Sequence, residues 1–192
     1  MKEDNTFWDL NRNWKLLQEQ IENPKLLLEK KGDPSFCYML YIDKDDESTF
    51  VDMQKDLELE GELIESGKFH ATVRYVKVDD HDSFVEYIKE LDLPKIEGKC
   101  VGFGIYGKEK DTLVVELDGE ELHSWFKKID KWLTDHDYPK SDYPTYKPHI
   151  SLTEKAGIEK PEWKKEYEKK IKFSIHVVSD RNYEEIIRLK AK

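Results

Sequence analysis

The sequence predicts an α+β fold in which helices pack outside one or two antiparallel sheets. Apolar residues repeat at every second position in some segments and at every third or fourth position in others, with Gly or Pro between many of them. The predicted order is helix–β–α–β–α–β–β–α–β–β–β, which is the pattern of an α+β protein. A strand–helix–strand unit over 35–78 is loosely matched over 111–153. We therefore expect a bilobal domain with two antiparallel sheets around a central groove and helices outside.

The first predicted element is a helix over 7–31, which has a partial apolar stripe and an interruption at an Asn-Pro pair. A Lys-Gly-Asp-Pro run then breaks the pattern before residue 35. The sequence therefore predicts an N-terminal helical extension over 1–34 and a separate domain over 35–192.

The first half of this domain alternates strands with helices. Residues 35–42 form an almost wholly apolar run, typical of a central strand, and an acidic loop follows it. Ser48 can cap a helix that extends to about residue 63. A Gly-Lys turn leads into a strand over 69–78, and an amphipathic helix over 83–92 ends before a proline.

The second half begins with strands over 95–106 and 111–117, joined by a Gly-Lys-Glu-Lys hairpin. A helix over 119–136 carries its apolar residues on one side. The rest comprises a Tyr- and Pro-rich loop over 137–148, a strand over 149–153, a polar segment with one helical turn around Trp163, and strands near 170–178 and 184–190.

The composition suits a soluble protein with one main domain. Of the 192 residues, 38% are hydrophobic, enough for a core, and 39% are charged. The net charge of −10 argues against a non-specific nucleic-acid or membrane binder, which needs a broad basic face. A small nucleotide in a locally positive cleft is still compatible with it. Cys37 and Cys100 are expected to be buried free thiols, and a disulfide requires that their strands be neighbours. The sequence contains no signal-peptide pattern and no apolar run of about 20 residues, so we expect a cytoplasmic protein.

Two short apolar segments carry the main functional pattern. Each places a His and a hydroxyl two positions apart, His70 with Thr72 and His149 with Ser151. Because a strand has a period of two residues, the members of each pair share one face. Two such strands side by side would gather two imidazoles and two hydroxyls on one surface. That set suits acid–base chemistry on a phosphate.

The bare pattern of His-x-Ser/Thr has little specificity. A third match, His81-Asp82-Ser83, lies in a polar stretch, and we interpret it as a solvated loop and helix N-cap. A strand histidine followed by a hydroxyl residue is also ordinary sheet composition. Strand context, equivalent places in the two halves and the Tyr/Pro loop before His149 favour the catalytic interpretation for the other two.

The pair of motifs resembles the 2H phosphoesterase superfamily, which includes the LigT-like RNA phosphodiesterases. Its members carry two His-x-Ser/Thr motifs in strands of a bilobal α+β fold. From about 36 to 153 the chain is most similar to the phage anti-CBASS nucleases, which degrade the cyclic oligonucleotides that bacterial defence systems use as alarm signals. The similar stretches are Phe69–Tyr75, Thr112–Leu117 with the Glu-Glu-Leu-His-Ser-Trp-Phe run that follows, and Asp142–Leu152. Residues 1–34 lie outside the resemblance.

The resemblance implies a viral immune-evasion enzyme, a hydrolase that cleaves 3′–5′ bonds of cyclic oligonucleotides in the host cytosol. His70 and His149 are the expected acid–base pair, since unperturbed imidazoles titrate near neutral pH without help from a metal. Thr72 and Ser151 are the expected ligands of the phosphoryl oxygens. Which histidine is the acid stays open at this stage. No cofactor is expected, and no metal either, because no compact ligand cluster is visible in the sequence.

Six further residues are candidates for substrate binding. Tyr38 resembles an aromatic residue that relatives use near the nucleotide, and we expect Tyr41 on the opposite, core side of that strand. His176 stands where relatives have a Glu that helps to hold a base, which leaves the base contact open. The remaining candidates are the loop tyrosines Tyr143 and Tyr146, which could stack on bases or simply pack, and the cations Arg74 and Lys147, which could offset substrate charge or be solvated.

Two other interpretations remain open on the sequence. The same fold could act as a 2′,5′-oligoadenylate or RNA 2′,3′-cyclic phosphodiesterase. A non-catalytic cyclic-nucleotide sponge, or a purely structural domain, belongs to another class, and an acid–base pair of histidines argues against it. The expected partner is a cyclic oligonucleotide, with no long nucleic acid and no membrane, and the oligomeric state is open.

Overall fold

The computed structural model describes residues 35–192, except for 79, 108–110, 142, 144, 155–157 and 181. The helix predicted over 7–31 lies outside the described residues. The elements are β1 (Phe36–Ile42), α3 (Glu47–Asp56), β2 (Glu62–Leu63), β3 (His70–Val76), α4 (Asp82–Glu90), β4 (Ile96–Tyr106), β5 (Thr112–Asp118), α5 (Glu120–Asp135), β6 (His149–Glu154), β7 (Lys170–Asp180) and β8 (Glu185–Lys190), with short 3-10 turns at Lys44–Asp46 and Lys165–Tyr167. The predicted α+β class is confirmed.

The described strands form a single eight-stranded antiparallel sheet, where the sequence predicted two sheets. The main path runs β1–β3–β6–β5–β4–β7–β8, and β1 pairs with β7 as well, so six of the strands follow one another in a closed ring. β7 makes the closure possible because it has 11 residues. Its first part pairs with β4, and its second part pairs with β1 on one edge and β8 on the other.

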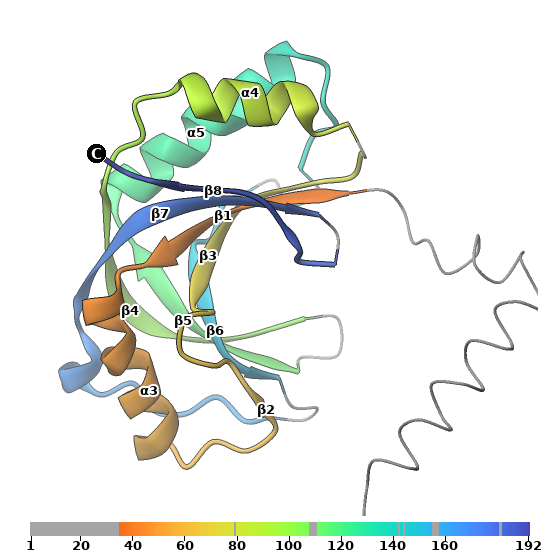
Figure 1. Cartoon of the computed structure of the whole chain (residues 1–192). Coiled ribbons are helices and arrows are strands. Elements are labelled where there is room, and N and C mark those ends of the chain that lie inside the picture. Colours follow the sequence, from red (N-terminus) through yellow and green to blue (C-terminus); the bar gives the residue numbers. More distant parts are fainter. Residues whose placement is uncertain are drawn as a thin grey trace, which may run out of the picture. The chain divides into compact units, whose positions relative to one another are not determined.

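The helices lie outside the curved sheet. In Figure 1, α4 and α5 lie above β1, β7 and β8, and α3 lies at the lower end of the molecule. Helix α5 buries one stripe of apolar side chains, Leu122, Trp125, Ile129 and Leu133, as the three-to-four-residue repeat predicts. These side chains and the inward residues of the strands form one continuous core. We call the sheet surface that faces this core the core face.

Helix α3 is shorter than the sequence predicts. It ends at Asp56, and the next residues include Glu58 with a φ of 47° and Gly61 with a φ of 96°, both in the left-handed region that terminates helices. The chain then forms the short strand β2 beside β6. The buried amide of Gln54 donates to the carbonyls of Ile64 and Leu152, at 2.9 and 2.7 Å, which attaches α3 to this strand pair.

The two cysteines are free and buried, as the sequence predicts. Cys37 lies on β1 and Cys100 on β4, and these strands are not paired with each other. The condition for a disulfide, adjoining strands, is therefore not met.

Candidate active site

The two His motifs lie on neighbouring antiparallel strands. β3 and β6 pair at Ala71 and Ile150, whose side chains are fully buried in the core. In an antiparallel pair this register sets His70 opposite Ser151 and Thr72 opposite His149. All four motif side chains are half-buried, and all project from the surface opposite the core face. We call this surface the motif face.

Each motif histidine is held by the backbone two residues before it. The Nδ1 atom of His70 is 2.8 Å from the carbonyl oxygen of Lys68, and the Nδ1 atom of His149 is 2.8 Å from that of Lys147. A carbonyl only accepts hydrogen bonds, so Nδ1 carries the hydrogen in both rings. The Nε2 atom of each neutral imidazole is therefore the one that can take up a proton.

The surroundings of both imidazoles lower their pKa and so favour the neutral form. Burial lowers the pKa of His70, the hydrogen bond to Lys68 raises it, and the charge of His149 lowers it further. Burial also lowers the pKa of His149, while its bond to Lys147 and the nearby carboxylate of Glu116 raise it. The two environments thus differ. His149 has a carboxylate beside it, whereas the charge that acts on His70 is that of His149.

Tyr41 lies beside His70 on the motif face. The two residues are paired across β1 and β3, and their ring centroids are 5.3 Å apart. The guanidinium of Arg188 lies 4.7 Å from the Tyr41 ring centroid and forms an ion pair with Glu185. Tyr41 was expected on the core side of its strand, and this position was wrong.

Thr72 contacts Cys37 on the same surface. Burial raises the pKa of the Cys37 thiol to about 12, and a side-chain hydrogen bond with Thr72 partly offsets this effect. The thiol therefore stays protonated at neutral pH, and the Thr72 hydroxyl sits beside a neutral group.

Two residues that the sequence analysis missed surround His149. Glu116 is its partner across β5 and β6, and the Tyr106 ring meets the imidazole edge-on with centroids 4.7 Å apart. The Tyr106 hydroxyl donates to Glu116 Oε1 at 3.1 Å. Burial, and then the Glu116 charge, raise the pKa of Tyr106 to about 12. One signal was available, since Glu116 is a single acidic residue inside the apolar strand Leu-Val-Val-Glu-Leu.

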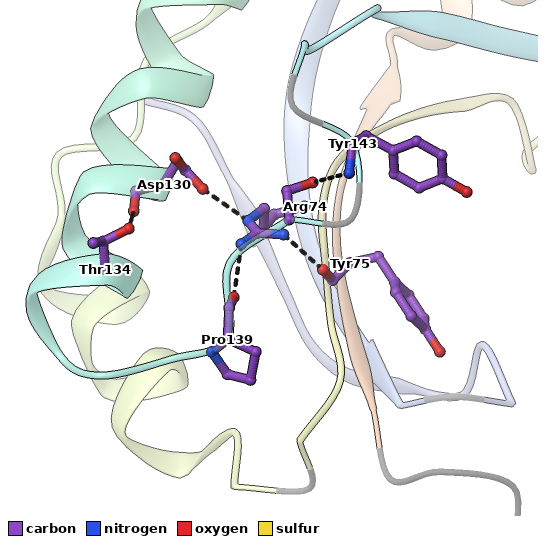
Figure 2. Close-up of polar contacts among 7 residues, drawn as sticks. Arg74, Tyr75, Asp130, Thr134, Pro139 and Tyr143 are labelled. Atoms are coloured by element: carbon purple, nitrogen blue, oxygen red, sulfur yellow. Dashed lines mark hydrogen bonds and ion pairs between the residues drawn. The ribbon is translucent and has the colours of Figure 1, made fainter.

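A strict two-residue alternation would place Arg74 on the same face as His70 and Thr72, but Arg74 lies on the core face. The register between β1 and β3 shifts at this point, since Tyr38 pairs with Arg74 whereas Met39 pairs with Thr72. The extra residue in β3 is a β-bulge, which reverses the alternation of faces. Arg74 is consequently 3% exposed and reaches Asp130 of α5 at 3.0 Å and the Pro139 carbonyl at 2.8 Å (Figure 2).

Tyr38 and His176 are also on the core face, so neither can contact a substrate bound at the motif face. Tyr38 is fully buried, and its hydroxyl lies 2.6 Å from Nδ1 of His176 and accepts from Trp125 Nε1 at 3.0 Å. His176 is 1% exposed, and its Nε2 lies 2.9 Å from the Pro94 carbonyl oxygen. The expected side of Tyr38 was therefore wrong, and His176, whose base contact the sequence left open, is buried in the core.

The three candidates in the loop before β6 differ in exposure. Tyr146 stacks on Phe126 of α5 with ring centroids 4.3 Å apart and has a buried hydroxyl, so it packs against the helix. Tyr143 is 74% exposed and points away from α5, on the same side as Tyr75 (Figure 2). The Lys147 side chain is exposed, and its carbonyl is the acceptor for His149.

Among the described residues, no three His, Cys, Asp or Glu side chains are grouped so that they could hold a metal ion. The described helices include none with the length and apolar character of a membrane span.

Comparison with solved structures identifies the fold. The chain is similar to Escherichia coli LigT in complex with 3′-AMP, with a TM-score of 0.60, 12% identity, and coverage of 83% of this chain and 99% of LigT. TT0787 of Thermus thermophilus gives a TM-score of 0.61 at 11% identity, with 82% and 97% covered. A third structure, a phosphoesterase, gives 0.59 at 12% identity, with 84% and 99% covered. No curated protein sequence matches the chain.

The closed antiparallel sheet, with the two His motifs on adjacent strands, therefore gives the chain the fold class of LigT and of the solved phosphoesterase structure. Within this class the sequence is more specific. The chain belongs to the family described as anti-CBASS protein Acb1, whose sequence model matches residues 38–190.

Proposed function

We propose that this protein is a phosphodiesterase that cleaves the 3′–5′ bonds of cyclic oligonucleotide immune signals by acid–base catalysis without a metal ion. The observation that carries the proposal is that His70 and His149 have the same position and the same hydrogen bonding on adjacent strands. Both occupy the motif face of adjacent strands, and both have Nδ1 bonded to a backbone carbonyl. Each Nε2 is then available to exchange a proton with a substrate. The Acb1 family supports the substrate class, and the expected place of action is the cytosol of the host cell.

The proposed step is attack by the ribose 2′-hydroxyl on the adjacent phosphorus. One neutral imidazole takes the 2′-hydroxyl proton at Nε2 as the P–O2′ bond forms. The other imidazole, protonated, gives its Nε2 proton to O5′ as the P–O5′ bond breaks. The products are a 2′,3′-cyclic phosphate and a free 5′-hydroxyl. Hydrolysis of the cyclic phosphate by the same pair in reversed roles gives a 3′-phosphate.

Thr72 and Ser151 are the proposed donors to the non-bridging phosphoryl oxygens. Each hydroxyl is half-buried and lies across the strand pair from the histidine of the other motif. Donors at fixed positions stabilise the charge that accumulates on these oxygens as the phosphorus becomes five-coordinate. Lys147 and Tyr143, both exposed near β6, are proposed to contact the substrate outside this centre.

Replacement of either histidine tests the chemistry. For His70→Ala and His149→Ala, we expect turnover to fall by about 10²–10⁴, because each removes one proton-transfer step. Liquid chromatography of the products measures the rate, and circular dichroism checks that both variants fold. An unchanged rate in folded His149→Ala protein would end the proposal.

The substrate is tested with a panel that contains cyclic di- and trinucleotides, linear 2′,5′-oligoadenylate and RNA with a 2′,3′-cyclic phosphate end. We expect cleavage of cyclic 3′–5′ substrates, with and without EDTA, detected by mass spectrometry. Turnover of only the 2′,5′-linked or RNA-end substrate would contradict the proposed substrate and would indicate a 2′,5′-oligoadenylate or RNA 2′,3′-cyclic phosphodiesterase. Full recovery of intact ligand after denaturation of a tight complex would indicate a sponge and contradict the enzymatic proposal.

A further inference from the structure

We propose that Glu116 is a positioning residue that keeps the proton of the resting pair on His149, so that His149 is the general acid and His70 the general base. This inference rests on the proposed function, because it assigns the two roles within that reaction. It is carried by the unequal surroundings of two otherwise matched imidazoles.

Glu116 lies where its charge can act on His149. The two residues are direct partners across β5 and β6, so their side chains leave the sheet on the same side. Glu116 is half-buried, where the effective dielectric is lower than in bulk water. The carboxylate acts as a nearby charge, since Nδ1 of His149 is already bonded to the Lys147 carbonyl and Nε2 is the atom that faces a substrate.

The position of the Glu116 carboxylate is fixed by its neighbours. The Tyr106 hydroxyl donates to Oε1, and the same Tyr106 ring packs edge-on against His149. Two glycines leave space for this arrangement. A Cβ atom at position 104 would lie 2.9 Å from Glu116 Oε1 and 2.7 Å from Tyr106 Cε1, and one at Gly102 would lie 3.5 Å from Oε2. Within the described residues, no Lys or Arg forms an ion pair with Glu116. No described cation therefore neutralises its charge.

The surroundings of His70 have the opposite character. Its neighbours on the motif face are the neutral Tyr41 ring, with Arg188 beyond it, and His149 itself. The carboxylate on that side, Glu185, is paired with Arg188. Among the described residues, the charged or titratable groups that face His149 are Glu116 and Tyr106 from β5 and β4, and His70 from β3. A first proton is stabilised at His149 by Glu116, and its charge then disfavours a second proton on His70.

Substitution of Glu116 by Gln separates charge from shape. The amide oxygen can still accept from Tyr106, but the negative charge is lost. We expect the alkaline limb of the kcat/KM profile, which reports the general acid, to move down by about one pH unit, so that activity falls about tenfold at pH 8 and by a progressively smaller factor as the pH is lowered. The matched control is Glu120→Gln, which removes the same charge from an exposed position at the start of α5.

A substrate with sulfur in place of the bridging 5′-oxygen distinguishes acid from base. A thiolate leaves without protonation, because a thiol is far more acidic than an alcohol. On this analogue of a cyclic dinucleotide, we expect the Glu116→Gln and His149→Ala variants to regain most of the wild-type rate, whereas His70→Ala stays inactive. Rescue of His70→Ala instead would reverse the assignment and overturn the proposal.

A readout that needs no substrate keeps this proposal separate from the proposed function. The carbon-13 resonances of the two imidazoles, followed by NMR against pH, are expected to show His149 protonating at a lower pH in Glu116→Gln than in the wild type. An unchanged His149 titration would refute the role of Glu116 even if the enzyme cleaves cyclic oligonucleotides. A shifted titration in a protein that cleaves nothing on the panel would instead refute the proposed function, and with it the catalytic roles.

Discussion

His70, His149 and His176 occupy two tautomeric states, and the accepting ring nitrogen has a different role in each state. His70 and His149 carry hydrogen on Nδ1, which the backbone carbonyls hold. In His176 it is Nε2 that faces a carbonyl, so Nε2 carries the hydrogen and Nδ1 accepts from the Tyr38 hydroxyl. The accepting nitrogen of His176, Nδ1, is consequently occupied by a hydrogen bond inside the core. The tautomer thus separates His176 from the two motif histidines, whose Nε2 atoms can take up a proton.

The Tyr38 hydroxyl is predicted to contribute to stability, because it bonds both Trp125 Nε1 and His176 Nδ1 in the core. Tyr38→Phe leaves these two buried atoms without a partner, and we expect the free energy of unfolding to fall by about 1–3 kcal/mol. Urea unfolding followed by tryptophan fluorescence measures this loss. The matched control is Tyr41→Phe, on the motif face and half-buried. Equal losses in the two variants would contradict this interpretation of the network.

At the scale of elements, the bulge in β3 explains both what the sequence could predict and where it failed. Most strand and helix limits follow from periodicity and breakers, and His70 with Thr72 share a face because they precede the bulge. Arg74 follows it, so a strict two-residue alternation assigns it to the wrong surface. A single extra residue leaves no mark in the hydrophobic pattern, because Val73 and Val76 are both apolar and both buried.

Tyr38 and Tyr41 were assigned to the wrong faces of β1 for a different reason. Both are aromatic residues in an apolar strand, and strand composition alone does not tell which of the two faces holds the core. Glu116 was missed because its relation to His149 depends on the β5–β6 register, which pairs residues 33 positions apart in the sequence. Local patterns can predict strands, but not which strands become partners.

Arg74→Ala is predicted to destabilise the fold and to leave substrate affinity unchanged. The variant removes bonds to Asp130, the Tyr75 carbonyl and the Pro139 carbonyl, which join β3 to α5 and the loop after it. We expect a loss of about 2–3 kcal/mol, below the cost for a fully buried ion pair because the Asp130 side chain is 37% exposed. Urea unfolding and KM are measured on the same preparations, with Arg74→Lys as the control that keeps the charge. A raised KM in an Arg74→Ala protein of normal stability would contradict this prediction and would indicate that Arg74 binds the substrate.

At the scale of the whole molecule, the buried imidazoles make stability depend on pH. Burial is the largest cause of the lowered pKa of His70, His149 and His176. In the unfolded chain these groups take up protons from about pH 6.5 downward, before they do so in the folded protein. The unfolded state then binds more protons, so the free energy of unfolding is predicted to fall as the pH drops below about 6.5.

Urea midpoints at pH 7.5, 6.5 and 5.5 measure this dependence. The double variant His70→Ala/His149→Ala lacks two of the three groups and should lose less stability over the same interval. Identical slopes for the two proteins would show that the motif histidines do not contribute to acid sensitivity.

The closed ring of strands has a consequence for synthesis of the chain. Both motif strands are complete by Glu154, but the ring closes only when β7 pairs with β1, a contact between residues 138 positions apart at Tyr38 and His176. At about 5–20 residues per second, a ribosome needs roughly 7–28 seconds to translate that interval. In the last part of this time, after Glu154 has been added, a nascent chain carries both motif histidines while β1 still has one exposed edge, open to pairing with other nascent chains. We expect the partly synthesised protein to depend on chaperones until β7 has left the ribosome.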